Sequence, residues 1–262
     1  MNKPQIKSGI FFYILVPSWR NFANFDRCIE SIFSQTYKNY KIIFADDASE
    51  YSISQKRHIR ETLKGHIVVF NKKRLYAVEN IYKALHGYAD NDNAVIVNVD
   101  GDDWLYGNNV LSTVASYYLR CNCLLTYGDC IIWDGKSMSK KLASAEKEYT
   151  NIAYPQKIHD KGSYRKELFF PLHLRTWKNW LYKMIEIDDF KDEKGNWLKY
   201  CVDMAMYFPM LEMAAGNCCV INKPLYVYNT ESKYNIIKYD PIQTVREELI
   251  IRRKKPYKKI NK

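Results

Sequence analysis

The stretch "IFFYILVPSWRNFANFDRCIESIFSQTYKNYKIIFADD", residues 10–47, contains two apolar runs separated by a helical pattern. Residues 10–16 form a continuous apolar run ended by Pro17, which is typical of a strand buried on both faces. The next segment repeats apolar residues every three or four positions, as an amphipathic helix does: Phe22, Phe25, Ile29, Ile32 and Phe33. The second run, residues 40–47, ends at two aspartates. This order of strand, helix and strand is typical of a parallel sheet.

The same alternation continues toward the middle of the chain. Residues 52–64 and 76–88 have helical patterns, whereas 66–70 and 94–99 are short apolar runs of strand length. The pattern predicts an α/β fold: a mostly parallel, doubly wound sheet with helices on both faces, in a single domain.

Polar side chains follow the ends of the predicted strands. They are Ser18, Asp46, Asp47, Asn71 and the cluster at 100–103. In open α/β sheets, ligands bind beyond the carboxyl ends of the strands. We therefore expect these side chains to line one crevice.

The segment "VNVDGDDWLY", residues 97–106, places Asp100, Asp102 and Asp103 within four positions. Asp and Gly both suit tight turns, so a surface turn is one interpretation. The other is a site for Mg²⁺ or Mn²⁺, because these ions prefer carboxylate oxygens and commonly bridge them to substrate phosphates. Turn chemistry alone does not account for five acids at neighbouring strand ends, so we favour the metal site.

The second half of the chain is less regular. A helix is expected at 108–120, followed by strands at 124–127 and 130–133 and a long polar loop at 134–170. Residues 173–185 predict an aromatic amphipathic helix, and residues 201–216 a helix that Pro209 kinks and Gly216 ends. Two short strands, 218–221 and 225–228, close the domain.

Composition excludes a membrane-spanning class. Hydrophobic residues make up 47% of the 262 residues, enough for a sizeable core. No apolar stretch approaches the roughly 20 residues that span a bilayer, and the first residues lack the apolar core of a signal peptide. The seven cysteines have neither metal-ligand spacing nor easy disulfide pairing. We expect reduced thiols and a cytoplasmic protein.

The net charge is +11, and part of it is concentrated at the C-terminus. Residues 250–262 hold seven basic side chains and no acid. We treat residues 241–262 as a basic tail. It is either a frayed, solvated terminus or a contact for an anionic membrane surface, nucleic acid or an acidic partner.

Several of these motifs resemble GT-A glycosyltransferases of family 2. The matching elements in the first half are the Pro-Ser after the first strand, "SIFSQTY" (31–37), "ADDAS" (45–49) and "NVDGDDWL" (98–105). Toward the end, "VDMAMYFPMLEMAAG" and "PLYVYN" resemble the helix that carries the family's general base and the closing segment. The resemblance implies a GT-A (Rossmann-like) domain over residues 1–240, with a nucleotide-sugar half at 1–110 and an acceptor half at 111–240.

The resemblance also implies roles for single residues on the donor side. Pro17 and Ser18 would contact the nucleotide base, and Asp47 would hydrogen-bond it. Asp100 or Asp102 would hold the donor ribose. Either Asp102 or Asp103 would ligate a Mn²⁺ or Mg²⁺ ion on the diphosphate of a nucleotide-sugar donor, most simply a UDP-sugar.

On the acceptor side, the resemblance implies that Asp203 is the general base of an inverting transfer to a glycan, lipid-linked or protein acceptor. Two positions depart from the family pattern: Arg20 replaces an Asn, and Val202 replaces the Glu before the base.

The sequence leaves two possible roles open for each of several other residues. Arg74 either supports the leaving diphosphate or is solvated, as Lys73 is expected to be. His173 is either a metal ligand or acceptor contact, or a packed side chain. Trp177, Trp180 and Trp197 either stack on an acceptor sugar or belong to the core or an interface, and exposed aromatic helices would also suit a homodimer.

Two other functions fit some of the same features. A nucleotidyltransferase would have a similar sheet and acids, but it usually has a Gly-rich loop after the first strand, and "VPSWRNFANF" contains no Gly. A basic nucleic-acid-binding module would suit the net charge, but clustered aspartates would repel a phosphate backbone. We therefore expect no nucleic-acid partner.

Overall fold

The computed structural model describes residues 9–140, 152–231 and 240–260. Within these residues the strands form one sheet in the order β3-β2-β1-β4-β8-β6-β9-β5, with β7 paired to β6. The strands are β1 (Phe12–Ser18), β2 (Tyr40–Asp46), β3 (Ile67–Phe70), β4 (Val95–Asn98), β5 (Trp104–Leu105), β6 (Leu125–Trp133), β7 (Met138–Ser139), β8 (Arg175–Lys178) and β9 (Cys218–Asn229).

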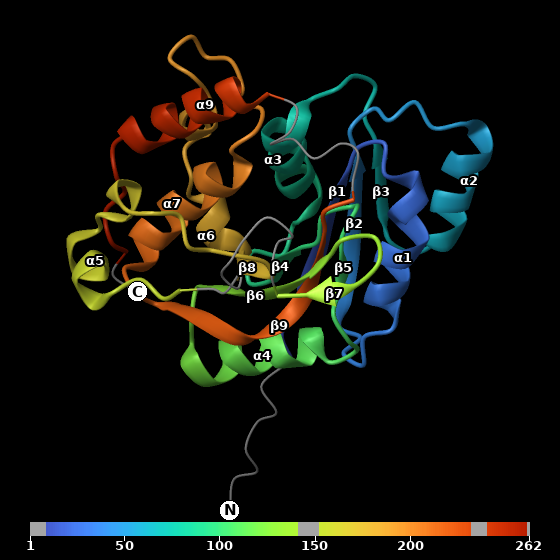
Figure 1. The fold of residues 1–262 in the computed structure, drawn as a ribbon, viewed down its shortest axis with the longest axis horizontal. Coiled ribbons are helices and arrows are strands. Elements are labelled where there is room, and N and C mark those ends of the chain that lie inside the picture. Colours follow the sequence, from blue (N-terminus) through green and yellow to red (C-terminus); the bar gives the residue numbers. More distant parts are fainter. Residues whose placement is uncertain (1–8, 141–151, 232–239, 261–262) are drawn as a thin grey trace, which may run out of the picture.

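Helices cover both faces of this sheet (Figure 1). The α-helices are α1 (Phe22–Phe33), α2 (Ile53–Thr62), α3 (Tyr76–Tyr88), α4 (Val110–Cys121), α5 (Gln156–Lys161), α6 (Asn179–Lys183), α7 (Val202–Ala214) and α9 (Pro241–Arg253), and the 3₁₀ helices are η1 (Tyr164–Lys166) and η2 (Ile187–Phe190).

The first half of the sheet forms as the apolar runs predict. β1 pairs in parallel with β2 on one side and β4 on the other, and β2 pairs in parallel with β3. Alternate residues of β1 enter different cores: Phe12 and Ile14 pack with α1 and α4, whereas Tyr13 and Leu15 pack with α3 and α7. The predicted single-domain, doubly wound α/β fold is confirmed.

The second half differs from the sequence-based expectations. Residues 173–185 are not one helix, because β8 is inserted antiparallel between β4 and β6 and only Asn179–Lys183 is helical. Hydrogen bonding to strands on both sides overrides the helical spacing of the aromatic residues. The strand pairs predicted at 124–133 and at 218–228 are each one continuous strand, β6 and β9, which pair in parallel through register shifts near Asp129.

The polar loop expected at 134–170 contains β7, α5 and η1, and residues 141–151 lie outside the described part. No helix in the described part of the chain has the length and apolarity needed to cross a membrane. All seven cysteines are free thiols.

The interpretation of residues 241–262 as a frayed tail is wrong for the described residues. Residues 241–253 form α9, and Ile251 is buried against the core. The amide of Ile260 donates to the Met213 carbonyl (3.0 Å), so the chain after α9 also packs along α7.

Candidate active site

A cavity of about 350 Å³ lies at the carboxyl ends of β1, β2 and β4, opposite the start of α7. All residues expected to bind the donor, the metal or the acceptor proton line it: Pro17, Ser18, Asp47, Arg74, Asp100, Asp102, Asp103 and Asp203. The expectation is wrong for Asp46 and Asn71. Asp46 is buried and accepts a hydrogen bond from the Ser49 amide, and Asn71 donates to Asn80 Oδ1.

Asp47 fixes the turn that precedes α3. Its Oδ1 accepts from the Leu75 amide (2.6 Å) and its Oδ2 from the Tyr76 amide (2.9 Å). Tyr76 has a φ of 63°, so these two bonds hold a conformation that a bulky residue rarely adopts. Burial raises the pKa of Asp47, although both amides and Arg74 oppose that shift.

The turn presents Arg74 to the cavity. Its guanidinium carbon lies 3.1 Å from the ring centroid of Trp19 and 4.6 Å from that of Tyr76. Its Nε is buried without a hydrogen-bond partner and stands 3.9 Å from Asp47 Oδ2. The Arg74 side chain is 31% exposed and lines the cavity, so the stacked guanidinium is placed to meet an anion there. Trp19 and Tyr76 also line the cavity, and sequence patterns did not single them out.

Gly101 brings the aspartate cluster against β1. Its amide donates to the Pro17 carbonyl (3.0 Å), and a Cβ at this position would lie 2.9 Å from the Ser18 side chain. Only glycine permits that approach. Asp100 then accepts from Asn98 Nδ2 (2.9 Å), and its pKa is raised to about 7 by removal from solvent and by the charges of Asp203 and Asp102.

Asp103 and Asp102 have different surroundings. Asp103 is buried, and its two oxygens accept from the Tyr226 hydroxyl (2.7 Å) and the Asn229 amide (2.8 Å). It therefore fastens the cluster to β9. Asp102 is half-buried at the cavity wall, with its carbonyl bonded to Asn229 Nδ2.

The described residues contain no group of three or more histidine, cysteine or carboxylate side chains placed to hold a metal ion by themselves. A divalent ion here would need oxygens from a ligand as well as one or two carboxylates, which is the usual arrangement for Mg²⁺. The crowded acids around Asp100 suit such an ion, because a cation would relieve their mutual repulsion.

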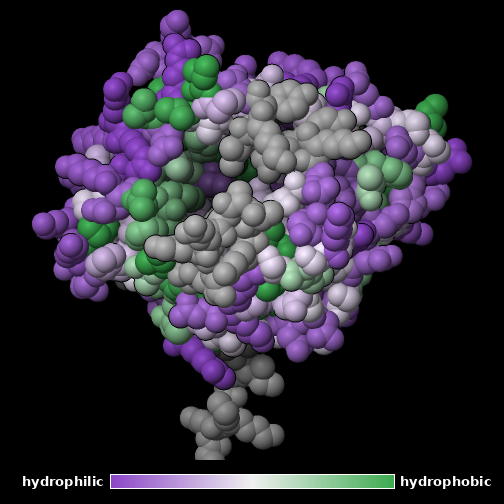
Figure 2. Space-filling view, in the orientation of Figure 1, coloured by the Kyte–Doolittle hydropathy of each residue, from purple (hydrophilic) through white to green (hydrophobic). Residues whose placement is uncertain are grey.

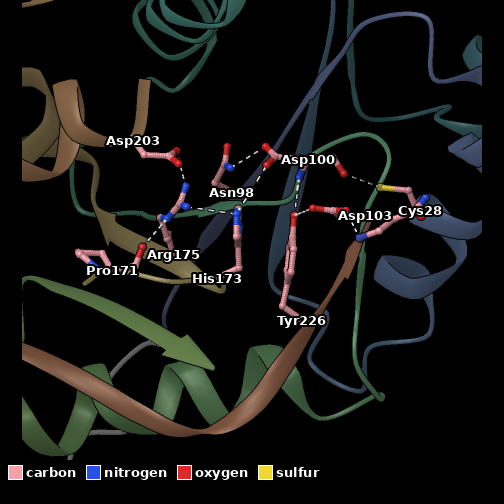
Figure 3. A network of polar contacts seen from close by, with 10 residues as sticks. Cys28, Asn98, Asp100, Asp103, Pro171, His173, Arg175, Asp203 and Tyr226 are labelled. Atoms are coloured by element: carbon pink, nitrogen blue, oxygen red, sulfur yellow. Dashed lines mark hydrogen bonds and ion pairs between the residues drawn. The ribbon is translucent and has the colours of Figure 1, made fainter. Parts of the chain in front are cut away.

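Asp203 faces this cluster from the first turn of α7, and Arg175 of β8 forms an ion pair with it (Figure 3). Arg175 is buried, and its Nε donates to the Pro171 carbonyl (3.1 Å). In the sheet it pairs with Asn98, just before Asp100. No sequence pattern indicates Arg175, because only the antiparallel register of β8 brings it here.

His173 packs between Asp100 and the ion pair of Arg175 with Asp203. Its ring stacks on Tyr226 with centroids 4.5 Å apart, and its Nε2 lies 3.2 Å from Arg175 and 4.0 Å from Asp100 Oδ2. Burial, and then the charge of Arg175, lowers the pKa of His173 well below its ordinary value, so the ring is neutral.

The tryptophans singled out from the sequence belong to the protein interior. Trp177 is buried in the core, and Trp180 and Trp197 pack at its edge.

The start of α7 is held by the C-terminal helix. Cys201, at the N-cap position, makes no side-chain cap. Instead the carboxylate of Glu247 in α9 accepts from the amides of Lys199 (3.0 Å), Tyr200 (2.8 Å) and Cys201 (3.4 Å). A carboxylate at a helix N-terminus satisfies free amides and favours the helix dipole. Glu247 thus positions the turn that carries Asp203, which no local pattern could have indicated.

The family model described as "Glycosyl transferase family 2" matches residues 13–190. No curated protein sequence matches the chain.

Solved structures with a similar fold share little sequence with the chain. Residues 1–349 of TarS from S. aureus, in complex with UDP-GlcNAc, have a TM-score of 0.58 at 13% identity, over 86% of this chain and 60% of that one. The mannosyltransferase PcManGT from Pyrobaculum calidifontis, in complex with GDP-Man and Mn²⁺, has a TM-score of 0.56 at 13% identity, covering 97% and 69%. GalNAc-T7 with UDP, GalNAc and Mn²⁺ has a TM-score of 0.58 at 11% identity, covering 85% and 44%. At these identities the likeness shows the GT-A fold alone, and this chain spans 60% of the TarS fragment.

Proposed function

We propose that this chain, which belongs to glycosyl transferase family 2, transfers a sugar from a nucleotide-diphosphate donor to an acceptor hydroxyl with inversion at the anomeric carbon. The observation that carries the proposal is that donor-side carboxylates, a stacked arginine and Asp203 all line one cavity. The uridine ligands named for two of the similar structures support a UDP-sugar as the donor.

The donor would lie along the ends of β1, β2 and β4. Pro17, Ser18 and Asp47 would contact the nucleotide base, and Asp100 the ribose. The Arg74 guanidinium would donate to the diphosphate, because its partly exposed side chain lines the cavity. This contact would stabilise negative charge on the departing diphosphate.

A divalent ion, Mn²⁺ or Mg²⁺, would supply further stabilisation of the diphosphate charge when bound. We assign its protein ligand to Asp102. Both oxygens of Asp103 already accept hydrogen bonds from β9, so Asp103 would act as a support for the cluster.

Asp203 would take the proton of the acceptor hydroxyl, which is otherwise a poor nucleophile. Arg175 would hold the carboxylate in one orientation while leaving it at the cavity surface, where 37% of the side chain is exposed. Attack from the side of α7, opposite the leaving diphosphate, would invert the configuration. Since Val202 offers no carboxylate beside the base, the orienting contact comes from Arg175 instead.

A donor screen tests the proposal. UDP- and GDP-sugars are incubated with the chain with Mn²⁺ present and absent, and release of the nucleoside diphosphate is measured. We expect metal-dependent release from at least one UDP-sugar and loss of that dependence in Asp102→Asn. Failure of every donor to bind or react, with or without metal, would contradict the proposal.

A further inference from the structure

Helix α9 carries large aliphatic side chains on its outer face as well as on its buried face. Ile251 and Glu247, one turn apart, are buried against the domain. On the opposite side Ile242, Val245 and Leu249 recur at intervals of three and four residues, and they are 77%, 57% and 47% exposed. A surface helix of a soluble domain normally presents polar residues on its outer face. This stripe of large aliphatic side chains is therefore a feature that folding of the domain does not explain.

Basic side chains surround this stripe. Arg246 and Arg253 lie on the outer side of α9, and Lys255, Lys258 and Lys259 follow on the packed segment after it, all of them exposed. The acids of the same helix face other groups: Glu247 is buried at the start of α7, and Glu248 pairs with Arg252 at 2.7 Å. The exposed charged side chains of α9 and of the segment after it are therefore all basic.

The same helix borders an apolar groove beside the candidate active site. The groove, of about 440 Å³, is lined by Leu168, Phe170 and Leu172 on one side and by Glu248 and Arg252 of α9 on the other. Phe169 and Met204 line both the groove and the active-site cavity. Leu168 at its rim is 74% exposed. Figure 2 shows apolar side chains among polar ones over the region of α9 and around a central hollow.

We propose that the outer stripe of α9 and the groove beside it form a docking surface for an anionic lipid bilayer. The aliphatic side chains Ile242, Val245 and Leu249 enter the acyl boundary, and the arginines and lysines contact the headgroup phosphates. Apolar insertion with flanking basic charge is the combination by which helices lie in a membrane interface. The positive charge of the rim selects this occupant over an uncharged surface or a second copy of the same basic face.

The position of the surface has a consequence that rests on the proposed function. A bilayer at α9 lies next to a groove that shares Phe169 and Met204 with the cavity of Asp203. An acceptor embedded in the membrane would reach the cavity with its apolar chain in the groove and its hydroxyl at the carboxylate. Docking itself needs no donor or acceptor, so it can be measured separately from sugar transfer.

The test is co-sedimentation of the full chain with vesicles, without donor or metal. Vesicles contain either phosphatidylcholine alone or phosphatidylcholine with about 30% phosphatidylglycerol, a content that gives a negative surface potential. We expect binding to the anionic vesicles, weakened by salt, and little binding to the neutral ones. The triple variant Ile242→Ser, Val245→Ser, Leu249→Ser should lower the apparent affinity at least about tenfold, since insertion scales with apolar area.

Two control variants show whether the loss of vesicle binding is specific to the α9 surface. Ile53→Ser with Leu119→Ser removes exposed aliphatic side chains from α2 and α4 and should leave vesicle binding unchanged. Arg246→Gln with Arg253→Gln should weaken binding about tenfold, whereas Arg57→Gln with Lys64→Gln, both exposed on the α2 side, should not. Circular dichroism checks that each variant is folded.

Three outcomes would overturn the proposal. They are failure to bind either vesicle, equal binding by the α9 variants and wild type, and a dimer in sedimentation velocity that the triple serine variant abolishes. The last result would show that a second copy covers the stripe. Loss of sugar transfer with unchanged vesicle binding would count against the proposed function and leave the docking surface in place.

Discussion

The two walls of the cavity hold their carboxylates in different ways. At the end of β2, Asp47 is fixed by backbone amides of the turn at 75–76, and Asp100 after β4 is fixed by Asn98 two residues earlier. Across the cavity, Asp203 depends on Arg175 of β8, and its helix turn depends on Glu247 of α9. The donor wall is thus built largely within its own half of the chain, and the acceptor wall is assembled from distant segments.

This difference indicates where each wall is vulnerable. The backbone amides that hold Asp47 are lost only on substitution by proline, so this part of the donor wall resists most single changes. The acceptor wall relies on single buried side chains, and the loss of one leaves polar groups unsatisfied and moves Asp203, the proposed base. The aspartate cluster is the exception on the donor wall, because β9 holds all three of its acids. Asp103 accepts from Tyr226 and Asn229, the Asp100 amide donates to the Tyr226 hydroxyl, and Asn229 Nδ2 donates to the Asp102 carbonyl.

The largest effect is expected for Asp203→Asn. Transfer to the acceptor should fall about 10³-fold, because an amide cannot take the proton of the acceptor hydroxyl. Donor affinity should remain within about twofold of wild type, since the donor wall is untouched. Steady-state kinetics and UDP binding measure the two quantities. Asp188→Asn, an acid with 89% side-chain exposure, is the matched control. Equal loss of binding and transfer would show that Asp203 is not the base.

Asp102→Asn tests the donor wall. We expect UDP affinity in the presence of Mn²⁺ to fall about 100-fold and the affinity without metal to stay the same, because the substitution removes the carboxylate proposed to bind the metal and keeps the size of the side chain. Titration calorimetry at two Mn²⁺ concentrations measures this. If Mn²⁺ still increases UDP binding by Asp102→Asn, another aspartate of the cluster binds the metal.

Glu247→Gln tests the distant support of the acceptor wall. Gln keeps one accepting oxygen but loses the negative charge, and its NH₂ group would face the Lys199 amide and the Gln243 side chain, so the start of α7 should loosen. We expect transfer to fall roughly tenfold with donor affinity unchanged, and stability to fall by about 1–2 kcal/mol. The neighbouring Glu248→Gln, whose carboxylate is bonded to Arg252, should change transfer less than twofold. If Glu247→Gln and Glu248→Gln have the same effect on transfer, Glu247 does not position Asp203.

The smallest effect is expected away from both walls, in the capping box of α2. There Ser52 Oγ accepts a hydrogen bond from the Gln55 backbone amide (3.2 Å), and Gln55 Oε1 accepts one from the Ser52 backbone amide (2.9 Å). Ser52→Ala should lower the free energy of unfolding by about 1 kcal/mol and leave both binding and transfer unchanged. Urea denaturation and kinetics would check both, and a change in donor affinity would mean that α2 is coupled to the cavity.

Much of the donor wall could be predicted from the sequence because its determinants are local. The apolar runs at 10–16, 40–47 and 94–99 specify strands, and the polar residues just after them must then lie at one edge of the sheet. Asp46 also follows a strand but does not line the cavity, because its side chain is buried and accepts a hydrogen bond from the Ser49 amide.

The acceptor wall could be predicted only in part. The helix that carries Asp203 was expected, but its partners were not. Arg175 lies in a segment whose aromatic spacing is typical of a helix, and only strand pairing on both sides makes it β8. Glu247 lies in residues 241–262, whose many basic side chains indicate a solvated tail or a contact for an anionic partner. Both contacts join residues far apart in the chain, which periodicity and spacing do not report.

The most direct test of the account is a crystal soaked with Mn²⁺ and UDP, with anomalous scattering used to locate the ion. We predict a manganese peak between the carboxylate of Asp102 and the diphosphate, the Arg74 guanidinium at the phosphate oxygens, and uracil beside Pro17 and Asp47. A manganese ion found only elsewhere, or UDP bound away from the ends of β1, β2 and β4, would contradict it.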